Sequence, residues 1–278
     1  MIARAPGIDV VLLIENGCLM PLAGKGLGRR GATLFFLHLP RTGGTSLMQY
    51  LDRQFEAGEI CPAHKIFEFE SLREQDRLAG YAFYRGHFGI NLPRLVDAGG
   101  QTITFLREPL ARFFSMWRHL RSRPVPFQGR SGGLIDYTQR IAGAARRLGF
   151  EEFCYAMMAE SGPLFLNSMT LLLGHGAGSQ LPPELGLAEM LDQAKRAVDG
   201  MAFVGFTETS AHSVLQLQLQ FGWDPEEIPH VNAAPASSLP LNPTFLDWLK
   251  EAVRFDHELY EHAARRWGLE TRGTNIPR

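Results

Sequence analysis

The feature that most constrains the fold is an unbroken apolar run followed directly by a short glycine-containing loop. The run covers residues 33–39 (TLFFLHL) and ends at Pro40. Continuous apolar character is typical of a strand that is covered on both faces, as in a parallel sheet. From Thr45 onward, apolar residues recur at helical spacing, at Leu47, Tyr50, Leu51 and Phe55. This order of strand, loop and helix predicts an α/β fold.

Two further units repeat this order. Residues 102–106 (TITFL) predict a second strand, followed by an amphipathic helix that begins near Pro109, a residue suited to the first helical turn. Residues 202–206 predict a third strand, and the helix after it ends at Gly222. We therefore expect a central parallel sheet with helices on both faces, the architecture of P-loop nucleotide-binding proteins.

The remaining segments are predicted to be mainly helical. Residues 134–200 favour helices around a loop rich in glycine and proline, at 174–183. At the end of the chain, Asn242 and Pro243 are expected to begin one long amphipathic helix that closes at Gly268.

Length and composition favour a single enzyme-sized domain. The chain has 278 residues, of which 45% are hydrophobic and 21% charged, with a net charge of -1. This balance does not suggest nucleic-acid binding. We expect a loose, glycine-rich leader over residues 1–31 and one domain over residues 32–278. The oligomeric state cannot be inferred.

The cysteines and the N-terminus favour a cytoplasmic protein. The three cysteines are widely spaced and form no CxxC pair, which favours a reducing compartment. The apolar run at residues 10–14 is too short to span a membrane, and it makes a poor signal peptide because Asp9 precedes it.

The first loop (PRTGGTS, residues 40–46) has the composition of an anion site. Its glycines let the backbone approach a ligand closely, its amides precede a helix, and Arg41 adds positive charge. Hydroxyl groups come from Thr42, Thr45 and Ser46. The loop is not a Walker A motif, because Gly44 stands where that motif requires lysine.

Residues 36–47 resemble the 5′-phosphosulfate loop of sulfotransferases that use 3′-phosphoadenosine-5′-phosphosulfate (PAPS), especially the group with the heparan sulfate 2-O- and 6-O-sulfotransferases. That loop usually reads HIPKTGGTS, so Arg41 replaces a lysine here. The resemblance implies that PAPS is the sulfuryl donor and that Arg41 contacts the departing phosphate. The phosphosulfate would lie against Thr42, Gly43, Gly44, Thr45 and Ser46.

A second motif, residues 104–115 (TFLREPLARFFS), resembles the 3′-phosphate-binding strand and helix of the same family. The resemblance implies that Arg107 and Ser115 bind the 3′-phosphate. Helical spacing predicts that Arg112 pairs with Glu108 on the helix surface. Weaker likenesses lie at 166–170, 203–208 and 231–235, so the resemblance covers residues 33–267.

Sulfuryl transfer to an alcohol needs a base near the hydroxyl, and no metal is expected because the chain has no clustered metal ligands. His87 lies between the two donor motifs, as does the histidine of the 2-O-sulfotransferase group, and imidazole suits general-base work near neutral pH. Three alternative bases stay open. One is a second histidine, His64, and the others are Glu68 and Glu70, because other sulfotransferases use a carboxylate as the base.

The resemblance implies that the acceptor is a hydroxyl compound, in particular a sugar. Lipids, tyrosine peptides and small molecules remain alternatives. Three arginines, Arg85, Arg118 and Arg121, are candidates for binding an acidic saccharide. Two other functions also stay open: a protein that binds the nucleotide without catalysis, and a P-loop kinase.

Overall fold

The computed structural model describes residues 32–96, 99–122, 133–176, 186–228 and 241–268, with the backbone alone at 66–67 and 133–136. It also describes the backbone of three short segments nearer the N-terminus. These segments are β1 (Ile2–Arg4), β2 (Val11–Glu15) and β3 (Cys18–Leu22), which pair as an antiparallel sheet. The sequence did not predict these strands, and the division into leader and domain stays a prediction.

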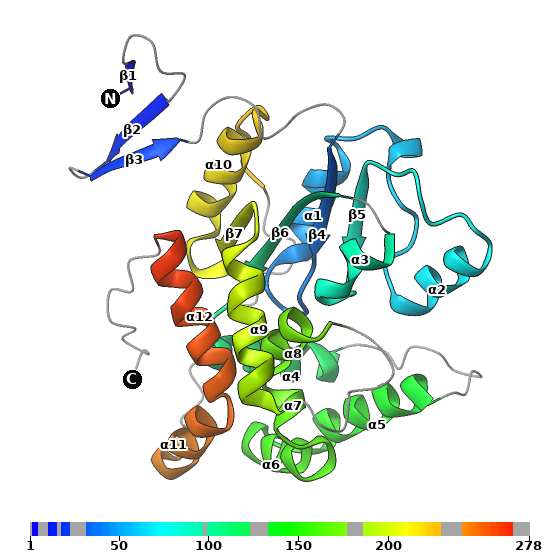
Figure 1. Ribbon diagram of the computed structural model, residues 1–278. Coiled ribbons are helices and arrows are strands. Elements are labelled where there is room, and N and C mark those ends of the chain that lie inside the picture. The colour runs from blue at the N-terminus through cyan, green and yellow to red at the C-terminus, as the bar shows by residue number, and fades with distance from the viewer. Residues whose placement is uncertain are drawn as a thin grey trace.

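A four-stranded parallel sheet forms the centre of the protein (Figure 1). Its order is β5-β4-β6-β7, so β4, which comes first along the chain among these four strands, lies inside the sheet. The strands are β4 (Thr33–Leu37), β5 (Phe83–Gly86), β6 (Gly100–Leu106) and β7 (Phe203–Phe206). The three strands expected from apolar runs are confirmed, and the aromatic segment before His87 supplies the fourth.

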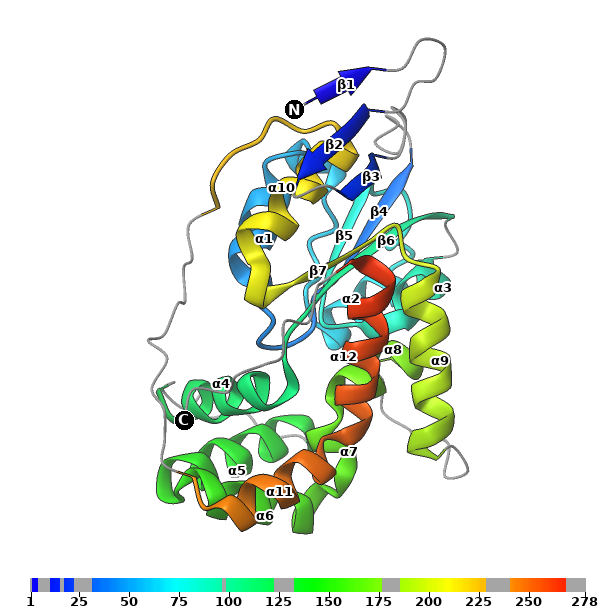
Figure 2. The same ribbon diagram turned by 90° about the vertical axis from the view of Figure 1, so that its left-hand side faces the viewer.

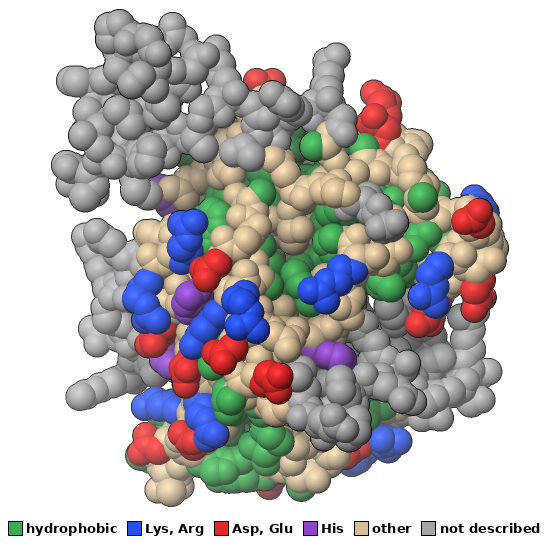
Figure 3. Space-filling view, in the orientation of Figure 1, with side chains coloured by type: hydrophobic (Ala, Val, Ile, Leu, Met, Phe, Trp, Pro, Cys, Tyr) green, Lys and Arg blue, Asp and Glu red, His purple; other side chains and the backbone are tan. Residues whose placement is uncertain are grey.

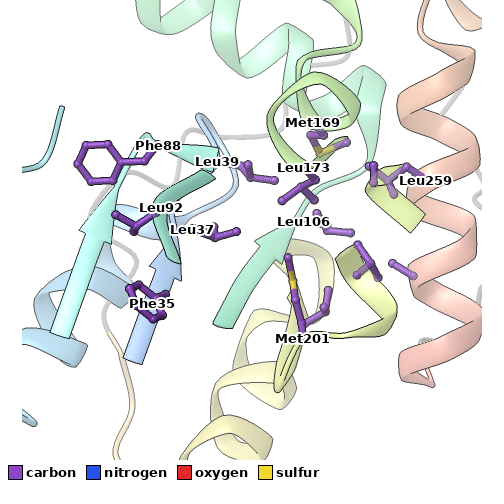
Figure 4. Packing of buried hydrophobic residues seen from close by; sticks show 14 of the residues in the cluster. Phe35, Leu37, Leu39, Phe88, Leu92, Leu106, Met169, Leu173, Met201 and Leu259 are labelled. Atoms are coloured by element: carbon purple, nitrogen blue, oxygen red, sulfur yellow. The ribbon is translucent and has the colours of Figure 1, made fainter. Parts of the chain in front are cut away.

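Helices cover both faces of this sheet, as predicted. Leu34 and Phe36 of β4 pack toward α1 and α10, whereas Phe35 and Leu37 belong to the cluster that includes α8, α9 and α12. Figure 2 shows α1 and α10 on one side of the sheet and α9 and α12 on the other. Figure 4 shows apolar side chains of the cluster that contains Phe35 and Leu37.

The helices have the following bounds: α1 (Gly44–Asp52), α2 (Ile66–Glu74), α3 (Leu92–Val96), α4 (Pro109–Ser122), α5 (Gly133–Arg147), α6 (Phe150–Ser161), α7 (Pro163–Leu166), α8 (Ser168–Gly174), α9 (Leu187–Asp199), α10 (Ser210–Phe221), α11 (Pro243–Ala252) and α12 (Arg254–Trp267). The predicted caps are confirmed at Pro109, Gly222 and Asn242, whose Oδ1 accepts from the Thr244 amide at 2.9 Å.

The expectation of one long C-terminal helix was wrong, because the chain divides into α11 and α12 at Val253. In an uninterrupted helix the Asp256 amide would donate to the Ala252 carbonyl. Instead, the Asn167 side chain lies between them, with Nδ2 donating to Ala252 O at 2.8 Å and Oδ1 accepting from Asp256 N at 3.0 Å. A side chain inserted into the helical hydrogen-bond ladder is a known cause of such breaks.

The predicted surface pair of Arg112 with Glu108 was also wrong. Arg112 is fully buried and donates to Asp256 Oδ2 at 3.2 Å and to the Leu166 carbonyl at 3.2 Å. Asp256 also accepts from the amides of Met169 and Thr170, at 3.1 and 2.7 Å. Glu108 instead caps α4 by accepting from two amides of its first turn. The buried pair thus joins α4, α8 and α12.

We expect Arg112→Ala to lower the free energy of unfolding by about 3–5 kcal/mol, because it leaves the buried Asp256 carboxylate without its cation. Urea unfolding followed by circular dichroism measures this change. The matched control is Arg140→Ala, which removes an exposed arginine paired with Glu160 at 3.1 Å and should cost at most about 1 kcal/mol. Equal losses in the two variants would contradict a stabilising role for the buried pair.

Candidate functional site

The predicted donor residues meet at the point where the strand order reverses. The chain leaves β4 toward β5 on one side, whereas β6 leads to β7 on the other side. In open α/β sheets, ligands bind in the crevice at the carboxyl ends of two such neighbouring strands. The loop at 40–43 follows β4 and Arg107 follows β6, so both lie at this crevice.

The glycines of the loop meet steric requirements. Gly43 has a left-handed φ of 79°, which L side chains rarely adopt. At Gly44 an added Cβ would lie 2.1 Å from Cδ2 of His38, so the imidazole packs directly against the first residue of α1. Gly43 is therefore required by the backbone conformation of the loop, and Gly44 by its packing against His38.

Two threonines fix the loop against the neighbouring strand. Thr42 is buried, and its hydroxyl donates to the Leu39 carbonyl at 3.0 Å. The hydroxyl of Thr207 lies within hydrogen-bond distance of the carbonyls of Thr42 (2.8 Å) and Leu106 (3.0 Å). The hydroxyl proton of Thr42 thus stays within the loop. Thr207, which lies in the weaker likeness at 203–208, is a positioning residue whose role the sequence did not indicate.

Arg41 joins the first motif to the second. Its Nε and one terminal nitrogen donate to Ser115 Oγ at 3.1 and 3.0 Å, and its other terminal nitrogen lies 3.2 Å from Nδ1 of His119. Arg41 adopts a left-handed φ of 72°, which costs a non-glycine residue about 1 kcal/mol. Such strain is found at functional sites where the surrounding structure enforces it.

Arg107 provides a second, partly buried cation. Its guanidinium donates to the backbone carbonyl of Arg41 at 3.3 Å. Burial lowers the pKa of Arg107, and the nearby carboxylates of Glu208 and Glu108 oppose that shift. Among the described residues, no carboxylate oxygen lies within ion-pair distance of Arg107. A desolvated cation without an ion-pair partner favours an anionic ligand.

The imidazole of His87 has a defined tautomer. Its Nδ1 lies 2.6 Å from the carbonyl oxygen of His38, which can only accept, so Nδ1 carries the proton and Nε2 is the basic nitrogen. The side chain is exposed, and its ring centroid lies 4.5 Å from that of the buried His38. Burial, with the charges of His87 and Arg41, holds the pKa of His38 at about 3, so His38 stays neutral beneath His87.

The three alternative bases have different surroundings. Glu68 caps α2, since its Oε2 accepts from the amides of His64 and Lys65 at 2.8 and 3.0 Å. Glu70 is exposed on the same helix. His64 lies next to His87, whose amide donates to the His64 carbonyl at 3.2 Å, and burial lowers the pKa of His64. The geometry therefore places His64, rather than the two carboxylates, beside the predicted base.

Arg85 is not available to bind a saccharide, which corrects the expectation from sequence. The side chain is buried, forms an ion pair with Asp52 and donates to the Cys61 carbonyl at 2.8 Å. Arg118 and Arg121 lie on α4, where their guanidinium groups pack over the rings of Phe114 and Trp117. These two residues remain candidates for contact with an acceptor.

A pocket of about 520 Å³ opens beside the phosphate loop, between α1 and α10. Thr42, Gly43 and Ser46 line it at the loop, and Thr207 lies at the end of β7. Apolar walls come from Leu47, Phe105, Val214 and Ile228. Its volume lies in the range of small-molecule sites. The two donor motifs supply one side of this pocket, whereas no motif marks the residues that line it from α10 and from 225–228.

Known proteins of related sequence are sulfotransferases. The chain is 23% identical over 263 residues to heparan-sulfate 6-O-sulfotransferase 2 of Gallus gallus, and 23% identical over 265 residues to the protein of that name from Danio rerio. The alignments cover 83% of this chain but only 65% and 57% of those relatives. The chain is thus distantly similar in sequence to two named sulfotransferases. The predicted resemblance is thus confirmed.

No family model matches the chain. Among solved structures, the crystal structure of mouse sulfotransferase SULT7A1 complexed with PAP matches 95% of this chain and 96% of that one, with 12% sequence identity and a TM-score of 0.39.

The rest of the described surface has two relevant features. Lysine, arginine and acidic side chains intermingle over the face formed by α9 and α12, so this face carries no patch of a single charge (Figure 3). No helix in the described part of the chain is long and apolar enough to cross a membrane.

The buried His38 predicts a pH dependence of stability. Its pKa of about 3 in the folded protein lies below the 6.5 of an exposed histidine, so the unfolded chain binds a proton that the folded protein does not. The free energy of unfolding should therefore fall as the pH drops below 6.5, by about 2 kcal/mol at pH 5 from this residue alone. Urea unfolding at pH 7 and at pH 5 measures the loss of unfolding free energy between the two pH values. This loss should be smaller by that amount in His38→Asn than in the wild type, and equal losses would contradict the role of His38.

Proposed function

We propose that this protein transfers a sulfuryl group from PAPS to a hydroxyl group of a sugar. The observation that carries the proposal is Arg107, a partly buried guanidinium with no carboxylate at ion-pair distance within the described structure. It lies at the carboxyl end of β6, beside a glycine loop of sulfotransferase type. The distant sequence relationship supports the same chemistry.

In this proposal the donor binds across the carboxyl ends of β4, β6 and β7. The phosphosulfate lies against the start of α1, where the amides of residues 43–46 and the hydroxyls of Thr45 and Ser46 can donate hydrogen bonds. Arg107 and Ser115 bind the 3′-phosphate, and Arg41 adds a second cation to the donor site. The apolar pocket between α1 and α10 accepts the adenosine.

The transfer step needs a base and a stabilised leaving group. The acceptor oxygen forms a bond to sulfur while the bond from sulfur to the bridging phosphate oxygen breaks, which releases 3′-phosphoadenosine-5′-phosphate (PAP). Nε2 of His87 takes the hydroxyl proton, since Nδ1 already donates to the His38 carbonyl. The amides at the start of α1 stabilise the charge that develops on the 5′-phosphate. The proposal involves no metal.

A sugar hydroxyl is proposed as the acceptor because both relatives are named as heparan-sulfate sulfotransferases. Phenol, lipid and peptide acceptors are the alternatives to screen, and the cytoplasmic location stays a prediction from sequence. A kinase is disfavoured because Gly44 replaces the lysine that a Walker A loop needs.

The first test concerns the donor. We expect PAP to raise the free energy of unfolding by about 2.7 kcal/mol at 100 times its dissociation constant. ATP at the same concentration should have little effect, because it lacks a 3′-phosphate. Thermal shift assays measure both. Arg107→Ala should abolish most of the preference for PAP, whereas Arg121→Ala, which removes an exposed arginine on α4, should preserve it. Equal shifts with PAP and ATP in the wild type would favour the kinase.

The second test separates a catalyst from a protein that only binds nucleotide. His87→Ala should lower turnover by roughly 10² to 10⁴ fold while leaving the affinity for PAP nearly unchanged. The wild-type rate should fall at acid pH, because protonated imidazole cannot accept the hydroxyl proton, and this dependence should vanish in the variant. His262→Ala is the control, since His262 pairs with Asp199 on the surface. Normal turnover of His87→Ala would exclude His87 as the general base and make His64 the next candidate.

A further inference from the structure

The side chain of Arg41 points to a role that differs from that of the lysine in related loops. The departing phosphate is expected at the start of α1. The guanidinium of Arg41 reaches α4, with two nitrogens 3.0 and 3.1 Å from Ser115 Oγ and the third 3.2 Å from Nδ1 of His119. Since arginine can only donate, Nδ1 of His119 is the acceptor.

The same residue is also joined to Arg107 through its backbone. Arg107 donates to the Arg41 carbonyl at 3.3 Å, so the two guanidinium groups and the Ser115 hydroxyl form one connected cluster. The left-handed backbone of Arg41 is part of this arrangement, with φ at 72°. All three groups can donate hydrogen bonds, and two of them carry a fixed positive charge.

We propose that Arg41 is a specificity-determining residue for the 3′-phosphate, acting with Arg107 and Ser115. This inference rests on the proposed function, because it assigns the ligand of a group within that donor site. A terminal phosphate has three oxygens and nearly two negative charges, so it can accept from two guanidinium groups and a hydroxyl at once. A planar fork suits this task, whereas lysine would supply only a compact point charge. The charge on the departing phosphate is then balanced by the amides of α1.

The experiment compares two ligands that differ only in the 3′-phosphate, PAP and adenosine 5′-monophosphate (AMP). Isothermal titration gives the ratio of their affinities in the wild type, Arg41→Met and Arg41→Lys. We expect the wild type to prefer PAP, and Arg41→Met to reduce that preference roughly 10- to 100-fold while AMP affinity changes little. Arg41→Lys should recover part of the preference, because it restores charge without the fork.

Two controls keep the result specific. Arg140→Ala removes one exposed arginine on α5 and should leave both affinities unchanged. Combining Arg41→Met with Ser115→Ala should reduce the preference less than the sum of the two single effects, because both residues bind one phosphate. Thermal unfolding of each variant confirms that it is folded, and Arg41→Lys replaces Arg41→Met if the latter is not.

The outcomes separate this inference from the proposed function. A wild type that binds PAP and AMP equally would overturn the proposed donor. A wild type that prefers PAP, with Arg41→Met losing affinity for both ligands alike, would leave the donor intact and return Arg41 to the 5′-phosphate. An unchanged preference in Arg41→Met would exclude Arg41 from 3′-phosphate recognition.

Discussion

The buried pair of Arg112 and Asp256 holds the second half of the candidate site in place. Arg112 lies on α4, and Asp256 on α12 also accepts from two amides at the start of α8. Because α4 carries Ser115 and His119, the position of these residues depends on a pair that makes no contact with the crevice itself. Loss of one partner from a buried ion pair is strongly destabilising. An arrangement of α4 that separated Arg112 from Asp256 would therefore be unfavourable.

The first half of the site depends on packing between His38 and Gly44. The imidazole occupies the volume that any side chain at Gly44 would need, and its carbonyl fixes the tautomer of His87. His38 therefore contacts both the start of the phosphate loop and the proposed base. Burial lowers the pKa of His38 and keeps its imidazole neutral, so the positive charge of the donor site comes from the arginines and not from His38.

Local patterns in the sequence were sufficient for the sheet and the loop. The apolar run before Pro40 and the glycines after it predicted β4, the turn and α1, because these features depend on neighbouring residues. The break at Val253 could not be predicted in this way, since it is caused by Asn167, which lies 85 residues before the carbonyl that it binds. Arg112 and Arg85 were misread for the same reason: helical spacing and charge suggested exposed residues, but their acidic partners come from distant segments.

The central claim is that one nucleotide binds across the carboxyl ends of β4, β6 and β7, and a crystal structure of the protein with PAP tests it most directly. The account predicts the 5′-phosphate against the start of α1, the 3′-phosphate between Arg107, Arg41 and Ser115, and adenine in the pocket beside α10. PAP bound elsewhere, or bound with its 3′-phosphate away from both arginines, would contradict the account.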